Sequence, residues 1–173
     1  MSQDPLPEDP GEADRTRRRV FWSLPSGLYV IGSRLGDRRH AMTASWVVPL
    51  ATEPKLIGVG VEQGALTLQL VREGGVFSVC TIARTDRALV RKFVKPPTFS
   101  PADGTLSGCP VHEEVTGAPI LDGAVAWLDC RVERLVDFGS HALVAGVVEA
   151  AGFQTGEDTP VLRMEDTRMS YGG

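Results

Sequence analysis

The stretch AVAWLDCRVERLVDFGSHALVAGVV, residues 124–148, decides the fold class. Its first half alternates small or apolar residues with polar or bulky ones, a period of two that is typical of a half-buried β-strand. The two alternating sets are Ala126, Leu128, Cys130 and Val132 against Trp127, Asp129, Arg131 and Glu133. Its second half, residues 141–148, is again apolar, and the turn sequence DFGS, residues 137–140, separates the halves. We therefore predict an antiparallel hairpin.

Other apolar runs on the N-terminal side of this hairpin predict further strands. Each run is short, rich in β-branched residues and bounded by glycine or proline. They cover residues 28–31, 42–48, 56–61 and 76–80.

Two short helices are predicted between the strands. Residues 66–73 fit either a helical turn or strand alternation, and we favour the helix because Gly74-Gly75 form a natural helix end. Residues 86–94 form a second helix, which Asp86 can cap at its N-terminus. Strands with so few helices argue against a doubly wound parallel sheet. The sequence thus predicts a mainly β fold, a small antiparallel barrel or sandwich with short helices.

The two ends and one internal segment show little periodicity. Residues 1–14 are acidic and proline-rich, which predicts a disordered tail ahead of a single domain over residues 15–173. The arginines that follow, between residues 15 and 19, are interpreted as a solvated first helical turn. Residues 95–119 hold five prolines and predict a long loop, of the kind that forms lids or partner contacts. The C-terminal residues 163–173 either fold onto the barrel or hang free.

Composition excludes several classes of protein. A chain of 173 residues fits one domain, and its net charge of −4 argues against a nucleic-acid-binding protein. No membrane-length apolar run and no signal peptide are present, so we expect a cytoplasmic protein. The cysteines lack CxxC spacing, and Cys80 and Cys130 are interpreted as reduced core residues. No spacing of histidine, aspartate and glutamate predicts a metal centre.

Two local motifs could contact a ligand. In HAMTASW, residues 40–46, Thr43 and Ser45 lie on the same face of a strand and offer hydroxyl groups, although such a strand is often merely solvated. The junction at residues 63–67 joins a strand to a helix, and free amides there can hold a phosphate. Helix capping explains the same junction equally well. Arg91 and Lys92 of the second helix are candidates for the same anion.

Five blocks of the sequence together resemble the flavin reductase-like family. In order they are FWSLPSGLYVIGSR (21–34), HAMTASWVVPLATEPKLIGVGV (40–61), FSVCTIARTDRALVRKF (77–93), GAPILDGAVAWLDCRVE (117–133) and GSHALVAGVVEA (139–150). The resemblance implies an FMN-binding split β-barrel, usually a homodimer, in a family that includes the reductase components of two-component monooxygenases.

The resemblance also implies site residues. The strand that holds the flavin ring and ribityl chain corresponds to Arg39, His40, Ala41, Met42, Thr43, Ala44, Ser45 and Trp46. The phosphate contacts correspond to Gly60, Val61, Glu62, Leu66, Thr67 and Lys92, and Phe93 is placed against the flavin. The turn Gly139-Ser140-His141 is placed where a nicotinamide docks, which makes His141 the candidate catalytic residue.

The implied function is an NAD(P)H:flavin oxidoreductase that reduces FMN or FAD with NADH or NADPH, with a monooxygenase as a further partner. Three positions depart from the family pattern: Ala41 replaces a glycine, the phosphate loop keeps only Thr67, and Ser140 replaces an aspartate. The last departure motivates an alternative, a flavin-binding electron carrier or holder without nicotinamide activity. A third hypothesis is a haem-binding barrel with His40 or His141 as axial ligand. Among the tryptophans, Trp127 is expected to face outward and to anchor a dimer interface.

Overall fold

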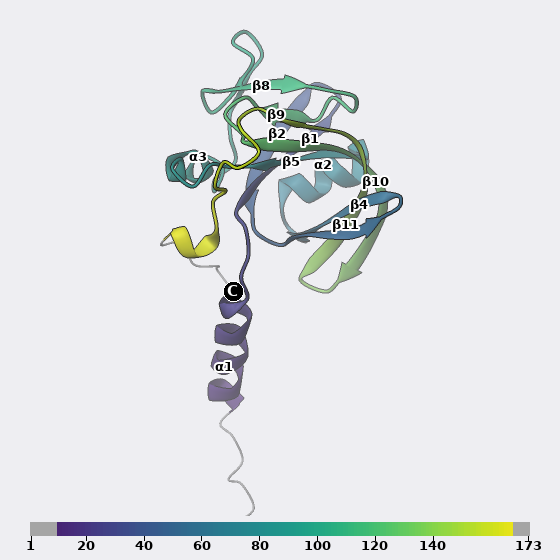
Figure 1. Cartoon of the computed structure of the whole chain (residues 1–173). Helices are drawn as coiled ribbons and strands as arrows, with labels where there is room; N and C mark the ends of the chain where they lie inside the picture. The colour runs from purple at the N-terminus through teal and green to yellow at the C-terminus, as the bar shows by residue number, and fades with distance from the viewer. Residues whose placement is uncertain (1–9, 168–173) are drawn as a thin grey trace, which may run out of the picture.

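The computed structural model describes residues 10–167, which form a strongly curved antiparallel sheet, a smaller sheet and short helices (Figure 1). The strands of the large sheet are β1 (Tyr29–Leu35), β2 (Arg38–Ala44), β3 (Val47–Thr52), β4 (Lys55–Glu62), β5 (Val76–Thr81), β10 (Ala126–Phe138) and β11 (His141–Phe153). Those of the small sheet are β6 (Phe99–Ser100), β7 (Thr105–Leu106), β8 (Cys109–Glu113) and β9 (Pro119–Leu121). The helices are α1 (Pro10–Ser23), α2 (Leu66–Gly74), α3 (Arg87–Arg91) and the 3₁₀ turn η1 (Met164–Asp166).

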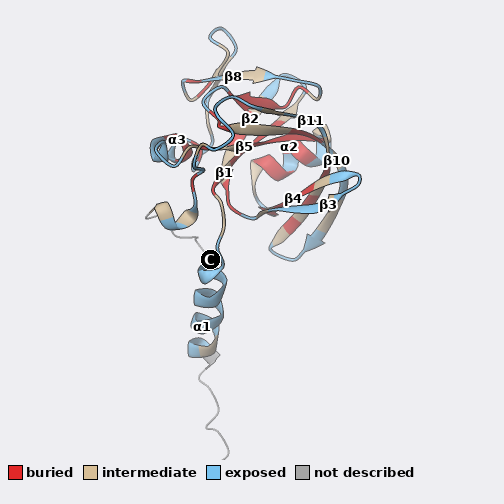
Figure 2. Cartoon of the chain, in the orientation of Figure 1, coloured by how far each residue is buried: buried red, intermediate tan, exposed pale blue. Residues whose placement is uncertain are grey.

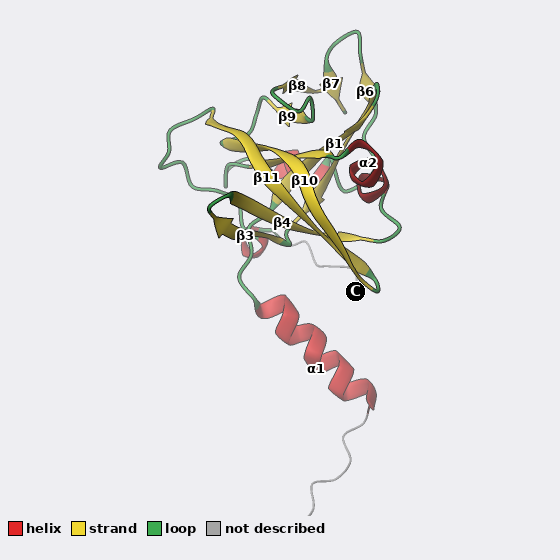
Figure 3. Ribbon diagram, turned by 90° about the vertical axis from the view of Figure 1, so that its right-hand side faces the viewer, coloured by secondary structure: helices red, strands yellow, loops and turns green. Residues whose placement is uncertain are grey.

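The large sheet has the order β2-β1-β5-β10-β11-β4-β3, and every neighbouring pair is antiparallel. Its two longest strands, β10 and β11, form the predicted hairpin, whose last register pair is Phe138 with His141 (Figure 3). The mainly β, antiparallel fold class is therefore confirmed.

Both predicted helices are present because their ends are fixed locally. Helix α2 ends at Gly74. The next residue, Gly75, caps the helix: it has the left-handed φ of 70° that glycine adopts without strain, and its N–H donates to the carbonyl of Val71. Helix α3 is shorter than predicted. Its N-cap is Asp86, whose carboxylate accepts a hydrogen bond from the Leu89 N–H at 3.3 Å.

Two apolar clusters hold the sheets and helices together. In Figure 2, buried residues lie along the strands of the large sheet and on α2. One lies between the large sheet and α2 and contains Phe77, whose burial alone stabilises the fold by about 2–3 kcal/mol. The other lies between the same sheet, α3 and the small sheet, and contains Phe93. Cys80 and Cys130 belong to the clusters as predicted, and burial raises the pKa of their thiols to about 11 and about 12.

The prediction of a disordered tail over residues 1–14 is wrong for residues 10–14. Helix α1 begins at Pro10, a residue suited to the first helical turn, and Asp14 pairs with Arg18 one turn later at 3.0 Å. The arginines near residue 15 thus lie inside an exposed helix rather than in its first turn. Residues 1–9 lie outside the described range. In Figures 1 and 3, α1 stands clear of the barrel.

The expected loop over residues 95–119 instead contains the small sheet β6–β9. This sheet covers the face of β10 that carries Trp127, which packs against the α3 cluster with its indole 6.1 Å from the His112 ring. Trp127 is therefore half-buried within its own chain, and the expectation of an outward interface anchor is corrected. The C-terminal segment folds onto the barrel as far as residue 167, since Leu162 is buried and its N–H donates to the Ile82 carbonyl.

Candidate functional site

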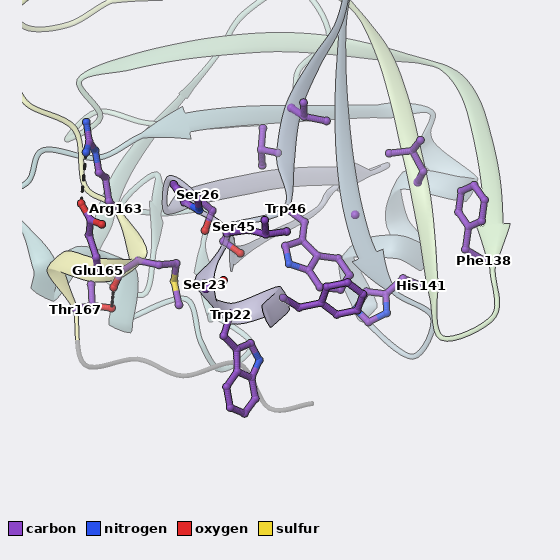
Figure 4. Close-up of a pocket in the computed structure, with 18 of the residues that line it drawn as sticks. Trp22, Ser23, Ser26, Ser45, Trp46, Phe138, His141, Arg163, Glu165 and Thr167 are labelled. Carbon is purple, nitrogen blue, oxygen red and sulfur yellow. Dashed lines mark hydrogen bonds and ion pairs between the residues drawn. The ribbon is translucent and has the colours of Figure 1, made fainter. Parts of the chain in front are cut away.

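A groove of about 910 Å³ runs between the barrel and the two ends of the described chain (Figure 4). Its walls come from four segments that are far apart in sequence: residues 21–26, 45–48, 138–143 and 163–167, with Gly60 between them. Most of the lining is apolar or aromatic, with a few hydroxyl groups and one histidine. Pockets of this size and character commonly hold cofactors.

Ser45 and Trp46 enter the groove because strand β2 ends at Ala44 and β3 begins only at Val47. Ser45 is 3% exposed, and its hydroxyl has no hydrogen-bond partner among residues 10–167. The Trp46 carbonyl accepts a hydrogen bond from the Gly60 N–H at 2.8 Å, which ties this junction to β4. The indole is half exposed and lies on the groove wall (Figure 4).

His141 enters the groove from the first position of β11, directly after the hairpin turn. The Ser140 hydroxyl lies 3.0 Å from His141 Nδ1, and the imidazole packs against the Trp46 ring with centroids 4.6 Å apart and planes tilted by 36°. The structure thus brings together a predicted nicotinamide residue and the end of the predicted flavin strand.

Four of the predicted site residues line the groove, and the others do not. The lining residues are Ser45, Trp46, Gly60 and His141. The alternation of β2 turns its other residues away. Ala41 belongs to the α3 cluster and Ala44 to the α2 cluster, with Met42 packed beside Ala44. Thr43 donates its hydroxyl to the Val90 carbonyl at 2.5 Å.

The predicted phosphate contacts are also engaged elsewhere. Thr67 is fully buried, and its hydroxyl lies 3.0 Å from His40 Nδ1. Lys92 is exposed, with Nζ 3.4 Å from the Cys109 sulfur. Among the remaining predicted residues, Arg39 pairs with Glu113 at 2.5 Å. Glu62 is exposed and Leu66 is half-buried. Val61 and Phe93 lie in the core.

Sequence reasoning missed the lining supplied by both chain ends. Phe21 and Trp22 close one side of the groove from the end of α1, and Arg163 and Glu165, paired at 3.4 Å, close another. Phe138 lines it from the hairpin tip. The FWSLP block belongs to the resemblance but had no role assigned, and the C-terminal residues carried no local signal.

Two further observations concern metal-binding clusters and membrane-spanning helices in the described part of the chain. Within residues 10–167 no three side chains of histidine, cysteine, aspartate or glutamate cluster in a way that could bind a metal ion. In the same range no helix combines the length and apolar character that crossing a membrane requires.

The chain matches the model of the flavin reductase like domain over residues 21–172. It belongs to that family. This flavin reductase-like chain is 30% identical over 137 residues to the reductase component of 4-hydroxyphenylacetate 3-monooxygenase from Thermus thermophilus, covering 79% of the chain and 82% of the relative. It is also 30% identical over 139 residues to a diflavin flavoprotein of Synechocystis sp., which covers 80% of the chain. The chain spans about a quarter (24%) of that longer relative.

A solved structure shares the fold of this flavin reductase-like chain. It is the NADH:FAD oxidoreductase of Streptomyces globisporus C-1027 in complex with NAD and FAD fragments, with 25% identity and a TM-score of 0.75. The match covers 92% of each chain. The split-barrel fold that the resemblance implied is therefore confirmed.

Proposed function

We propose that this protein is an NAD(P)H:flavin oxidoreductase that passes a hydride from a nicotinamide to FMN or FAD. The observation that carries the proposal is the meeting of His141 with Ser45 and Trp46 in one apolar groove. Similarity to the Thermus reductase component and to the Streptomyces oxidoreductase supports it.

The groove residues fit a flavin in size and in chemistry. The buried Ser45 hydroxyl lacks a hydrogen-bond partner within the described chain, so a polar atom of a bound ring would satisfy it. The Trp46 indole offers an aromatic face to a flat ring. Ser45, Trp46, Gly60 and His141 would hold the isoalloxazine end. Thr67, Lys92 and the other phosphate contacts stay predictions from the family resemblance.

In the proposed mechanism the chain positions its ligands rather than exchanging protons. When bound, a flavin supplies the two-electron acceptor, and hydride transfer needs no acid–base pair from the protein. The apolar walls exclude water, and Trp46 presents its face to the ring system. His141, beside it, would orient the nicotinamide. Holding the nicotinamide and the flavin in contact lowers the entropic part of the activation barrier, because the reacting groups are aligned before the chemical step.

We further propose a homodimer and a monooxygenase partner that receives reduced flavin. Large apolar residues around the groove support a protein contact there: Phe21 is 66% exposed, Trp22 49% and Phe138 66%. Exposed aromatic groups of this kind often mark interfaces. Size-exclusion chromatography with light scattering tests the dimer, and a monomeric mass would reject it.

NADH consumption by the purified protein, in air with and without FMN, tests the activity. We expect oxidation that depends on added flavin, and comparison with FAD and NADPH then defines the preferred pair. His141→Ala should slow flavin reduction more than it weakens flavin binding. An unchanged reduction rate at saturating NADH would remove His141 from the mechanism.

A second candidate function is favoured by the Ser140–His141 turn. Ser140 brings no charge to His141, whereas the family resemblance places an aspartate there. A protein that binds flavin without oxidising NADH or NADPH would be an electron carrier or holder. A yellow protein with no NADH turnover is the result that selects this alternative.

A further inference from the structure

His141 is restrained by Ser140 in only a limited way. The Ser140 hydroxyl lies 3.0 Å from His141 Nδ1, but Ser140 is exposed at the hairpin tip. A hydroxyl group rotates freely and can donate or accept, so this contact fixes neither the charge nor the plane of the imidazole. The orientation of the ring therefore depends on what lies against its face.

That contact is the Trp46 indole, 4.6 Å from the imidazole between centroids (Figure 4). Trp46 reaches His141 across β4, and this is feasible because position 60 is glycine. A Cβ atom at Gly60 would stand 3.0 Å from Trp46 Cε3 and 3.1 Å from its Cβ. The Gly60 N–H also donates to the Trp46 carbonyl at 2.8 Å. The backbone and the missing side chain together fix where the indole lies.

The charged groups near this pair come from two elements. Glu62 is opposite His141 in the register of β4 and β11. Arg163 and Glu165 of the C-terminal segment line the same groove but pair with each other at 3.4 Å. The Trp46 indole is the aromatic ring that packs against the imidazole.

We propose that Trp46 is a positioning residue for His141, and that its indole holds the imidazole in the orientation that receives the nicotinamide. The inference rests on the proposed reductase function. A histidine at the first residue of a strand would otherwise sample several rotamers, and each docking event would have to select one of them. The indole packed against the imidazole removes that selection before the nicotinamide arrives. Its loss should therefore raise KM for NADH more than it lowers kcat.

The first test reads the contact without flavin or nicotinamide. In a Trp22→Phe/Trp127→Phe background Trp46 is the single tryptophan; Trp127 is removed because the His112 ring lies 6.1 Å from it. An imidazole in contact with an indole alters the emission of that indole, so adding His141→Gln at constant pH should change the intensity of Trp46 emission. Equal emission from the two proteins would overturn the contact, and with it the proposal.

The second test separates positioning from structure by kinetics at saturating flavin. Trp46→Ala should raise KM for NADH about two- to tenfold, the factor that corresponds to one aromatic pair, whereas Trp46→Phe should stay near wild type. Phe153→Ala, an exposed aromatic residue outside the groove, is the matched control and should leave KM unchanged. A wild-type KM in Trp46→Ala would overturn the positioning role.

Failure of the proposed function gives a different pattern. If the wild-type protein oxidises no NADH or NADPH, the reductase proposal and the nicotinamide role of Trp46 both fall. Comparison of Trp46 emission with and without His141→Gln in the single-tryptophan protein would still show whether the indole and imidazole are in contact.

Discussion

His40 and Thr67 are joined in the core, where His40 Nδ1 lies 3.0 Å from Thr67 Oγ1 beneath helix α2. His40 is only 7% exposed, and its Nε2 atom has no hydrogen-bond partner in the described part of the chain. Strand β2 therefore buries His40 on the face of the sheet that packs against α2, and not in the groove, although the resemblance placed this histidine beside the flavin.

This environment predicts a loss of stability in mild acid. Burial, with a smaller contribution from the charge of Arg38, lowers the pKa of His40 below its usual 6.5. Between the two pKa values the unfolded chain binds more protons than the folded one. The free energy of unfolding should therefore fall as pH decreases below about 6.5, and His40 should have no effect above it.

Urea denaturation at pH 5.5 and 7.5 measures this effect. We expect His40→Gln to lessen the difference between the two pH values, because glutamine does not titrate, and His141→Gln to retain it. Hydrogen bonds from Arg84 and neighbouring groups lower the pKa of Asp166 below 3.8, so protonation of that carboxylate changes stability only at a pH below this range. Equal pH dependence in wild type and His40→Gln would contradict the prediction.

A pair of glycines tests how closely the two sheets pack. A Cβ atom at Gly32 would lie 2.1 Å from the Pro119 carbonyl oxygen and 2.4 Å from Ser78 Oγ, whereas one at Gly64 would meet nothing within 4 Å. We expect Gly32→Ala to cost about 3 kcal/mol or more, since backbone must move, and Gly64→Ala to change stability by less than about 1 kcal/mol. Thermal or urea unfolding measures the stability of both variants. Similar losses of stability would contradict the prediction and show that β9 can shift at little energetic cost.

Two buried hydroxyl groups separate ligand binding from packing. Ser45 and Ser33 both have unpartnered, buried Oγ atoms within residues 10–167, but Ser45 lines the groove and Ser33 does not. Ser45→Ala should weaken flavin binding about 5- to 30-fold, the equivalent of one hydrogen bond, without lowering the stability of the free protein. Ser33→Ala should leave flavin affinity unchanged. Fluorescence titration with FMN measures the affinity of each variant. Equal losses of FMN affinity in Ser45→Ala and Ser33→Ala would show that Ser45 does not contact the flavin.

The Asp129 carboxylate fixes the segment that leads into β9. It is fully buried, accepts the Thr116 N–H at 2.8 Å and also accepts the Thr116 hydroxyl. Asp129→Asn replaces one acceptor by a donor and should destabilise the protein by about 1–3 kcal/mol. The exposed Asp122, which pairs with His112 at 2.6 Å, is the control: Asp122→Asn should cost less than about 1 kcal/mol. Chemical denaturation of both variants measures the difference, and comparable losses would refute a special role for burial.

Features encoded by neighbouring residues were predictable from the sequence. The period of two over residues 126–133 identified the hairpin, because successive side chains of a strand face opposite sides. Gly75 ended α2 and Asp86 capped α3 through contacts within one turn. The ordered blocks of the resemblance then identified the split barrel and the family.

The shape of the site was decided by tertiary structure. Because side chains alternate along β2, His40 points toward α2 and Thr43 points toward α3. Of the predicted residues 39–46, only Ser45 and Trp46, which follow the end of the strand, line the groove. The other walls come from residues 21–26 and 163–167, which no local pattern links to position 141. These segments meet because closure of the sheet brings distant parts of the chain together. Local patterns predicted most strands of the large sheet, but neither the small sheet nor the set of side chains that share the groove.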